Sequence, residues 1–289
     1  MRKLKIFLEM IKFEHTLFAL PFAYMGAVLG SVYVFDRLPT WSEIGWITLA
    51  MIGARTAAMG LNRIIDRAID ARNPRTENRA IPAGLLSSLE VWLFIVISFV
   101  LLFVATSNLD PLSMKLLPIA VIFLVGYSYT KRFTWACHII LGLTIGLAPL
   151  GAWVAVTGQI DITVMVFYLA VALWTAGFDV LYACQDMEFD QKEGLHSIPA
   201  RFGIVRALWI ARVFHLLTAT GLLSLIWLAD LSWFYIIGMI IAYIILIYEH
   251  RLVSPNDLTR LNTAFFTMNG VLSVVLFTFT IIDLVVRYG

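Results

Sequence analysis

The chain has 289 residues, of which 61% are hydrophobic and only 14% charged, and its formal net charge at pH 7 is +2. This composition excludes an ordinary soluble domain, and a nucleic acid partner is not expected. Because the strands of a membrane β-barrel would alternate in polarity, the long apolar runs predict an all-α, polytopic membrane helical bundle.

Residues 1–14 are polar and basic, with an amphipathic pattern that predicts a helix on the cytoplasmic membrane surface. The basic residues of this segment are Arg2, Lys3, Lys5 and Lys12. No small-residue cleavage site follows the first apolar run, so we expect no cleavable signal peptide.

Nine apolar runs follow, each close to the roughly 20 residues that a bilayer requires. They cover residues 15–35, 41–65, 89–107, 112–130, 137–157, 162–185, 207–229, 232–249 and 263–285. Pro118 and Pro149 lie inside the fourth and fifth runs, where kinked membrane helices tolerate proline. We therefore expect one domain, residues 1–289, with nine transmembrane helices.

Small residues inside these runs are predicted to pack rather than to react. Gly142, Gly146 and Gly151 in the fifth run suit close helix–helix contact. Cys137 and Cys184 lie in apolar surroundings, and we expect two small core residues, not a disulfide or a metal site.

Basic residues gather in alternate loops, which predicts the orientation of the chain. One side carries Arg67, Arg72, Arg75, Arg79, Lys131, Arg132, Lys192, Arg201, Arg206, Arg251 and Arg260. The other side carries only Arg37, Lys115 and Arg287. The positive-inside rule thus places the N-terminus and the loops 67–88 and 187–206 in the cytoplasm, the chain in the inner membrane and the C-terminus outside.

Two rows of polar side chains lie at the ends of apolar helices on this cytoplasmic side. In the first acidic ridge, Asn62, Asp66 and Asp70 follow one another at four-residue spacing and share a helix face. The second acidic ridge contains Asp179, Tyr182, Asp186 and Asp190. The similar tetrapeptides at 80–83 and 197–200 follow the two ridges. Ionisable residues at the edge of a membrane helix are costly and indicate function.

Both ridges supply oxygen atoms, which are the ligands that Mg²⁺ prefers. In proteins Mg²⁺ is commonly bound by one or two carboxylates together with substrate phosphates. The surrounding arginines and lysines fit a site that binds metal and a polyanion together. The sequence therefore predicts a site for divalent metal and diphosphate. The alternative is a run of solvated helix-end charges that obey the positive-inside rule.

Arg55 lies two turns before Asn62 on the same helix face, inside an apolar segment. A buried arginine requires a partner or an anionic ligand. Either a structural ion pair with Asp179 or a substrate carboxylate, held bidentately by the guanidinium, would satisfy it.

These motifs together resemble the UbiA superfamily of intramembrane aromatic prenyltransferases, over nearly the whole chain. The first family motif, Asn-Asp-x-x-Asp-x-x-x-Asp, is matched at positions 62–70 except that Arg63 replaces its second residue. The second, Asp-x-x-Tyr-x-x-x-Asp-x-x-x-Asp, is matched at positions 179–190. Residues 127–132 are similar to the family's Tyr-Pro-x-x-Lys-Arg, with Ser128 in place of proline. The Arg63 variant is similar to the branch that holds 4-hydroxybenzoate polyprenyltransferases and the menaquinone enzyme of the futalosine pathway.

The resemblance implies that a polyprenyl group passes from polyprenyl diphosphate to a ring carbon of a hydroxylated aromatic acid in quinone biosynthesis. The acceptor is either 4-hydroxybenzoate or 1,4-dihydroxy-6-naphthoate, and the bundle is expected to open sideways to the lipid bilayer for the tail. Two Mg²⁺ ions would be held by Asn62, Asp66, Asp70, Asp186 and Asp190. The catalytic residues implied are Asp66, Asp70, Asp186, Asp190, Asp179 and Tyr182. The substrate-binding residues implied are Arg55, Asn62, Arg72, Arg75, Arg79, Tyr127, Lys131, Arg132 and Lys192.

The main alternative from another class is a membrane transporter with an intramembrane charged pathway. Its carboxylates should lie on broken helices at the midplane, and only Arg55 favours it. A membrane alcohol phosphotransferase would need a denser aspartate motif on adjacent turns. No obligate protein partner is expected.

Overall fold

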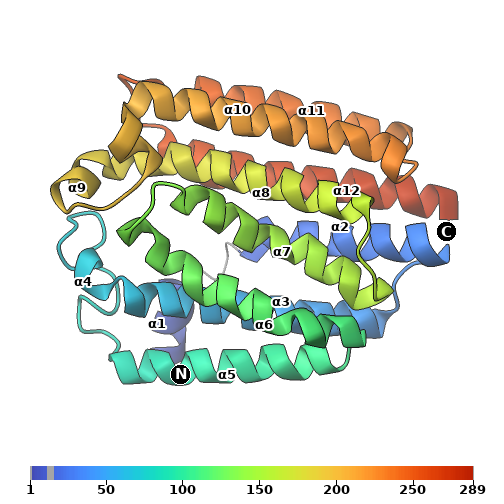
Figure 1. Ribbon diagram of the computed structural model, residues 1–289, viewed down its shortest axis with the longest axis horizontal. Helices are drawn as coiled ribbons and strands as arrows, with labels where there is room; N and C mark the ends of the chain where they lie inside the picture. Colours follow the sequence, from blue (N-terminus) through green and yellow to red (C-terminus); the bar gives the residue numbers. More distant parts are fainter. Residues whose placement is uncertain (1, 12–15, 289) are drawn as a thin grey trace.

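The computed structural model describes residues 2–11 and 16–288, which fold into a bundle of long helices whose axes lie nearly parallel (Figure 1). The long helices are α2 (Thr16–Phe35), α3 (Trp41–Ile65), α5 (Ser88–Ser107), α6 (Pro111–Gly126), α7 (Cys137–Thr157), α8 (Ile162–Ala183), α10 (Ile198–Leu228), α11 (Trp233–Arg251) and α12 (Asn269–Tyr288). The predicted all-α membrane bundle is confirmed. In the described part of the chain, eight helices are long and apolar enough to cross a membrane, and α2 contributes a shorter apolar stretch, Ala19–Phe35, so the count of nine is approximate.

Shorter elements join these helices. They are α1 (Arg2–Met10), α4 (Arg67–Asp70), the 3₁₀ turns η2 (Tyr127–Arg132) and η3 (Cys184–Asp186), α9 (Met187–Lys192) and the π-helix η4 (Thr263–Met268). Helices α4 and α9 meet at one end of the bundle, opposite the C-terminus (Figure 1).

Local sequence sets several helix starts. Thr40 and Ser87 each form a capping box with a glutamate three residues later, at the starts of α3 and α5. The seventh apolar run was predicted to begin at residue 207, but α10 begins at Ile198 because Ser197 caps it. A kink at Gly203, with φ of +79°, separates this first turn from the apolar part of α10.

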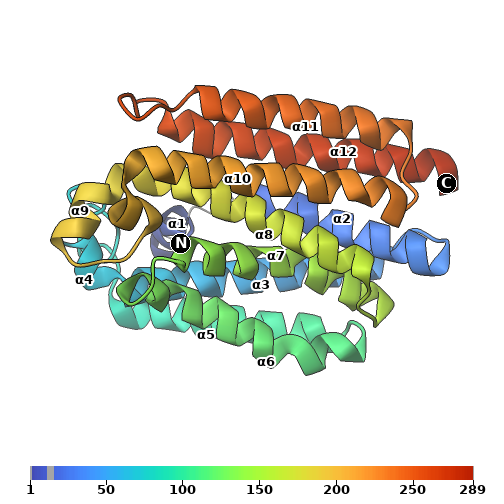
Figure 2. The ribbon, with the colours of Figure 1, turned by 45° about the horizontal axis from the view of Figure 1, so that its top comes forward.

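Helix α1 lies across the direction of the bundle rather than along it (Figure 2). Its apolar face, Phe7 with Met10 and the following Ile11, is buried in a cluster with residues of α3 and α5, including Leu61 and Ile95. The predicted amphipathic helix therefore forms, although the predicted basic residue Lys12 lies outside the described residues.

Helix α7 packs closely between α2 and α8, since small residues let the backbones approach. A Cβ on Gly142 would overlap the carbonyl oxygen of Ala172 in α8, and a Cβ on Gly146 would lie 2.9 Å from the carbonyl oxygen of Tyr168. The prediction was wrong for Gly151, whose Cβ position has no atom within 4 Å. Pro149 stays inside α7, as the sequence predicted.

The two cysteines are free thiols, as predicted. Cys184 is buried among the side chains of the core, as predicted, whereas Cys137 is half-buried at the start of α7 and lines a polar cavity, so the prediction of a core residue was wrong for Cys137.

Candidate active site

The two acidic ridges line one polar cavity of about 760 Å³ at the end of the bundle where α4 and α9 meet. Its volume lies within the roughly 300–1,000 Å³ typical of ligand pockets. Most of the residues singled out from the sequence line it: Arg55, Asn62, Asp66, Asp70, Arg75, Arg79, Tyr127, Lys131, Asp179, Tyr182, Asp186 and Asp190.

The two carboxylates of the first acidic ridge are buried and paired with cations. Asp66, at the junction of α3 and α4, is 2% exposed and lies 2.8 Å from Lys131 Nζ and 3.0 Å from Arg132 Nη2. Asp70, at the end of α4, accepts two hydrogen bonds of 2.7 and 2.8 Å from Arg79 Nη1. Buried carboxylates are costly unless paired, and these cations offset that cost.

The second acidic ridge is joined to the loop of the first. Asp186 accepts hydrogen bonds of 2.9 and 2.6 Å from the guanidinium of Arg75 and one of 3.2 Å from Asn73 Nδ2. Burial opposes the charge of the Arg75 guanidinium, but its bonds to Asp186 outweigh burial and raise the pKa of Arg75. Asp190, farther along the ridge, accepts a 2.8 Å hydrogen bond from Ser197 Oγ. The two halves of the chain therefore meet in one ionic network.

Three residues implied by the family resemblance do not line the cavity. Arg72 forms an ion pair of 2.9 Å with Glu193. Lys192 is exposed at the end of α9. Arg132 lies behind the cavity wall, where it holds Asp66 and donates to the carbonyl oxygens of Ser128 and Ile65.

Five further polar residues hold the site together and were given no role from the sequence: Arg63, Asn73, Ser128, His138 and Ser197. Arg63, noted only as a departure from the motif, is 9% exposed and donates to Asn62 Oδ1 at 3.2 Å. Asn62 Nδ2 in turn donates to Asp66 at 3.0 Å and to Ser128 Oγ at 3.3 Å. The similar tetrapeptides after the ridges were the only signal for Ser197, and nothing in the sequence pointed to His138.

Arg55 does not form the ion pair with Asp179 that was one of its two predicted roles. Asp179 instead lies 2.7 Å from His138 Nδ1. Arg55 is half-buried in α3 and lines both the polar cavity and a second, apolar one.

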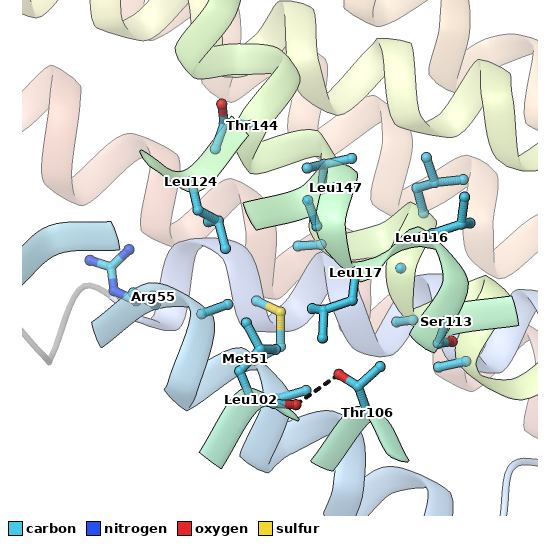
Figure 3. A pocket seen from close by; sticks show the side chains of 18 of the residues that line it. Met51, Arg55, Leu102, Thr106, Ser113, Leu116, Leu117, Leu124, Thr144 and Leu147 are labelled. Carbon is cyan, nitrogen blue, oxygen red and sulfur yellow. Dashed lines mark hydrogen bonds between the residues drawn. The ribbon is translucent and has the colours of Figure 1, made fainter. Parts of the chain in front are cut away.

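The apolar cavity, of about 320 Å³, lies between α3, α5, α6 and α7 (Figure 3). Arg55 lies at one end and Ser113 toward the other, with Met51 and Leu117 between them. Ile119 of α6 also lines the cavity and is 52% exposed, so only a thin wall separates the cavity from the outer surface of the bundle. Arg55 marks the point where the polar and apolar cavities adjoin.

The oxygen atoms that line the polar cavity fit a divalent cation that is also coordinated by a substrate. The Asn62 amide and the four aspartates predicted as ligands, Asp66, Asp70, Asp186 and Asp190, line one cavity, and oxygen donors of this kind suit Mg²⁺. Among the described residues, no three acidic, histidine or cysteine side chains lie close enough to form a metal site by themselves. Mg²⁺ typically takes one or two carboxylates and completes its coordination with substrate phosphates and water.

A family model, the UbiA prenyltransferase family, matches residues 19–271. The 4-hydroxybenzoate octaprenyltransferase of Aliivibrio fischeri (strain MJ11) is 31% identical over 168 residues, which are 58% of this chain and 58% of that protein. The match therefore spans less than two thirds of that relative. The protein of the same name from Tolumonas auensis is 29% identical over 234 residues, covering 81% of this chain and 82% of the relative.

Solved structures share the fold. The apo structure of a UbiA homolog from Aeropyrum pernix K1 has a TM-score of 0.84 and 29% identity, covering 93% of this chain and 98% of that one. A UbiA homolog from Archaeoglobus fulgidus bound to GPP and Mg²⁺ has a TM-score of 0.76 over 97% of this chain and 99% of that one, at 19% identity. With a family match over most of its length and both acidic ridges in one cavity, this chain belongs to the UbiA prenyltransferase family.

Proposed function

We propose that this protein transfers a polyprenyl group from polyprenyl diphosphate to a ring carbon of 4-hydroxybenzoate or 1,4-dihydroxy-6-naphthoate. One observation carries the proposal: a cavity lined by two cation-paired carboxylate ridges adjoins an apolar cavity within the same bundle. The names of the Aliivibrio and Tolumonas relatives support an aromatic acceptor. The GPP and Mg²⁺ bound to the Archaeoglobus homolog support the donor and the metal.

Two Mg²⁺ ions are proposed to be held by Asn62, Asp66, Asp70, Asp186 and Asp190, with the donor's diphosphate completing their coordination. When bound, Mg²⁺ neutralises charge on the diphosphate and so makes it a better leaving group.

The basic residues that now pair with the ridges are proposed to turn to the diphosphate. Arg75, Arg79 and Lys131 each bond a ridge carboxylate and line the cavity, so a bound polyanion can replace these carboxylates as their partner. Arg132 acts only through Asp66. We assign Arg72 and Lys192 no contact with substrate, since neither lines the cavity.

Bond cleavage leaves an allylic cation, which the acceptor ring attacks ortho to its hydroxyl. The site is proposed to shield this cation from water, because Asp66 and Asp70 on its wall are buried within the bundle. Tyr182 lines the cavity, and the Arg75 guanidinium lies 5.5 Å from its ring centroid. The ring face that Arg75 covers becomes available when Arg75 turns to the diphosphate, so Tyr182 is proposed to stabilise the allylic cation.

The two remaining substrate groups are assigned to the place where the cavities adjoin. Arg55 is proposed to hold the carboxylate of the acceptor, and Tyr127, which also lines both cavities, to pack against its ring. The first part of the prenyl tail is proposed to occupy the apolar cavity and the rest to leave past α6 into lipid. We also propose that the single domain lies in the inner membrane with its α4–α9 end in the cytoplasm.

The transporter alternative gains nothing from the geometry. The acidic ridges lie at helix ends, at the junctions α3–α4 and α8–η3, and not on helices broken at mid-length.

The test is turnover of both acids by the purified protein in lipid, with and without metal. We expect Asp186→Asn to abolish prenyl transfer and excess chelator to do the same reversibly, with Mg²⁺ restoring activity. Asp230→Asn serves as the matched control, because Asp230 is a carboxylate paired with an arginine, Arg287, but lies far from the cavity after α10. Full activity in excess chelator would contradict the metal assignment, and no transfer to either acid would contradict the proposed function.

A further inference from the structure

His138 is a buried polar residue of the cavity wall that the proposed mechanism leaves without a role. It is the second residue of α7, is 3% exposed and lines the polar cavity. Its two ring nitrogens have different partners. Nδ1 lies 2.7 Å from Asp179 Oδ2, and Nε2 lies 3.3 Å from the backbone nitrogen of Ile198.

The Ile198 contact determines the tautomer of His138. A backbone N–H can only donate, so Nε2 must carry a lone pair and no proton. The ring proton of a neutral imidazole then lies on Nδ1, which donates it to Asp179. Asp179 Oδ2 accepts this bond.

The Ile198 N–H is fixed because it belongs to the start of α10. The first N–H groups of a helix lack partners within the helix. Here the Ala200 N–H donates to the side chain of the capping Ser197 at 3.2 Å, and Pro199 has no N–H. The Ile198 N–H is therefore the donor that the cap does not satisfy, and His138 accepts it.

The same turn reaches the other end of the second acidic ridge, because Ser197 Oγ donates to Asp190. The preceding residue is also held, since the His196 N–H donates to the carbonyl oxygen of Lys131 at 2.7 Å. The start of α10 thus couples Asp190 to Asp179 through Ser197, Ile198 and His138.

We propose that His138 is a positioning residue that holds Asp179 as an oriented carboxylate, with its second oxygen left to accept the hydroxyl proton of the aromatic acceptor. Asp179 lines the cavity, and 23% of its side chain is exposed, against 4% for His138. This inference rests on the proposed prenyl transfer.

With Asp179 as the base, protons and electrons balance over the whole reaction. Asp179 takes the hydroxyl proton, the oxygen electrons pass through the ring to form the new C–C bond, and diphosphate leaves with the electron pair of the broken C–O bond. The hydrogen on the substituted ring carbon then leaves as a proton to diphosphate, which restores the aromatic ring, and Asp179 returns its proton to the oxygen. General base catalysis of this kind contributes about 10²–10⁴ in rate.

Two substitutions of His138 test the roles of its two ring nitrogens separately. The amide nitrogen of asparagine can take the place of His138 Nδ1 and donate to Asp179, whereas the amide nitrogen of glutamine reaches the place of Nε2. We expect His138→Asn to keep kcat within about tenfold of the wild type, and His138→Gln to lower kcat by roughly 100-fold. The KM for prenyl diphosphate and the thermal stability should be similar in the two variants. An equal loss in both variants, or a loss that follows thermal stability, would overturn the proposal.

A second measurement does not depend on activity. In protein labelled with ¹⁵N-histidine, the His138 signals are those lost in His138→Asn, and they should report a neutral ring with its proton on Nδ1. A doubly protonated ring or a proton on Nε2 would overturn the inference even if the enzyme is active. Failure of the wild type to use either acid, with the predicted tautomer present, would instead count against the proposed function.

Discussion

Arg55 is the residue that best separates an acid acceptor from a neutral one. It lines both cavities from within the apolar part of α3, and its guanidinium can hold a carboxylate through two hydrogen bonds. Arg55→Lys keeps the charge but loses the paired N–H groups that make these two hydrogen bonds. Hydrogen bonds to charged groups contribute about 1.5–3 kcal/mol and 1.4 kcal/mol is tenfold, so we expect the KM for the acceptor to rise roughly 10–100-fold.

Steady-state kinetics with each substrate varied in turn checks this prediction. The KM for prenyl diphosphate should barely change, because the proposed metal ions and the loop cations hold that substrate. A rise in the donor KM alone would assign Arg55 to the diphosphate. No change in either KM would leave Arg55 with a purely structural role.

Helix α7 shows how single glycines set the spacing of elements. We expect Gly142→Ala to destabilise the protein by about 1–3 kcal/mol, since the added methyl group meets the backbone of α8 and cannot be relieved by a side-chain rotation. Gly151→Ala, in the same helix, is the control and should be neutral or stabilising by up to about 1 kcal/mol, because it gains helix propensity in open space. Thermal unfolding of the two variants in one detergent compares them, and equal midpoints would contradict this account of the packing.

Helix α6 is the thin wall of the apolar cavity, and filling the cavity from this helix tests the tail assignment. Ala120 of α6 lines it. We expect Ala120→Phe to lower kcat/KM for an octaprenyl donor about tenfold, roughly 1.4 kcal/mol, while a dimethylallyl donor is used as before. Val100→Phe on the exposed face of α5 is the control. Equal losses with both donors would show that the prenyl tail does not occupy this cavity.

The whole bundle places two distant loops at one end, which labelling can test. In a background without Cys137 and Cys184, we expect Glu77→Cys and Lys192→Cys to react with an impermeant maleimide only from the cytoplasmic side. Gln159→Cys, in the loop between α7 and α8, should react only from the opposite side. All three positions are exposed. Labelling of Glu77→Cys and Lys192→Cys from opposite sides would contradict the shared site.

The sequence by itself determined the features that are local in the chain. Long apolar runs predicted the membrane helices, because each span must satisfy its own backbone hydrogen bonds in lipid. The four-residue spacing of Asn62, Asp66 and Asp70 likewise placed them along one side of a helix end, and all three line the cavity.

Only the tertiary structure decided which groups meet across the bundle. Asp186 pairs with Arg75 from 111 residues away, whereas Arg72, three residues earlier, turns to Glu193 and does not line the cavity. Gly142 packs against α8 while Gly151 meets nothing, although both lie in one apolar run. The physical reason is that the spacing of residues predicts which side chains share a face of a helix, but not which other helix packs against that face. The partner of a side chain depends on how the helices pack, and so Asp179 lies against His138 and not against Arg55.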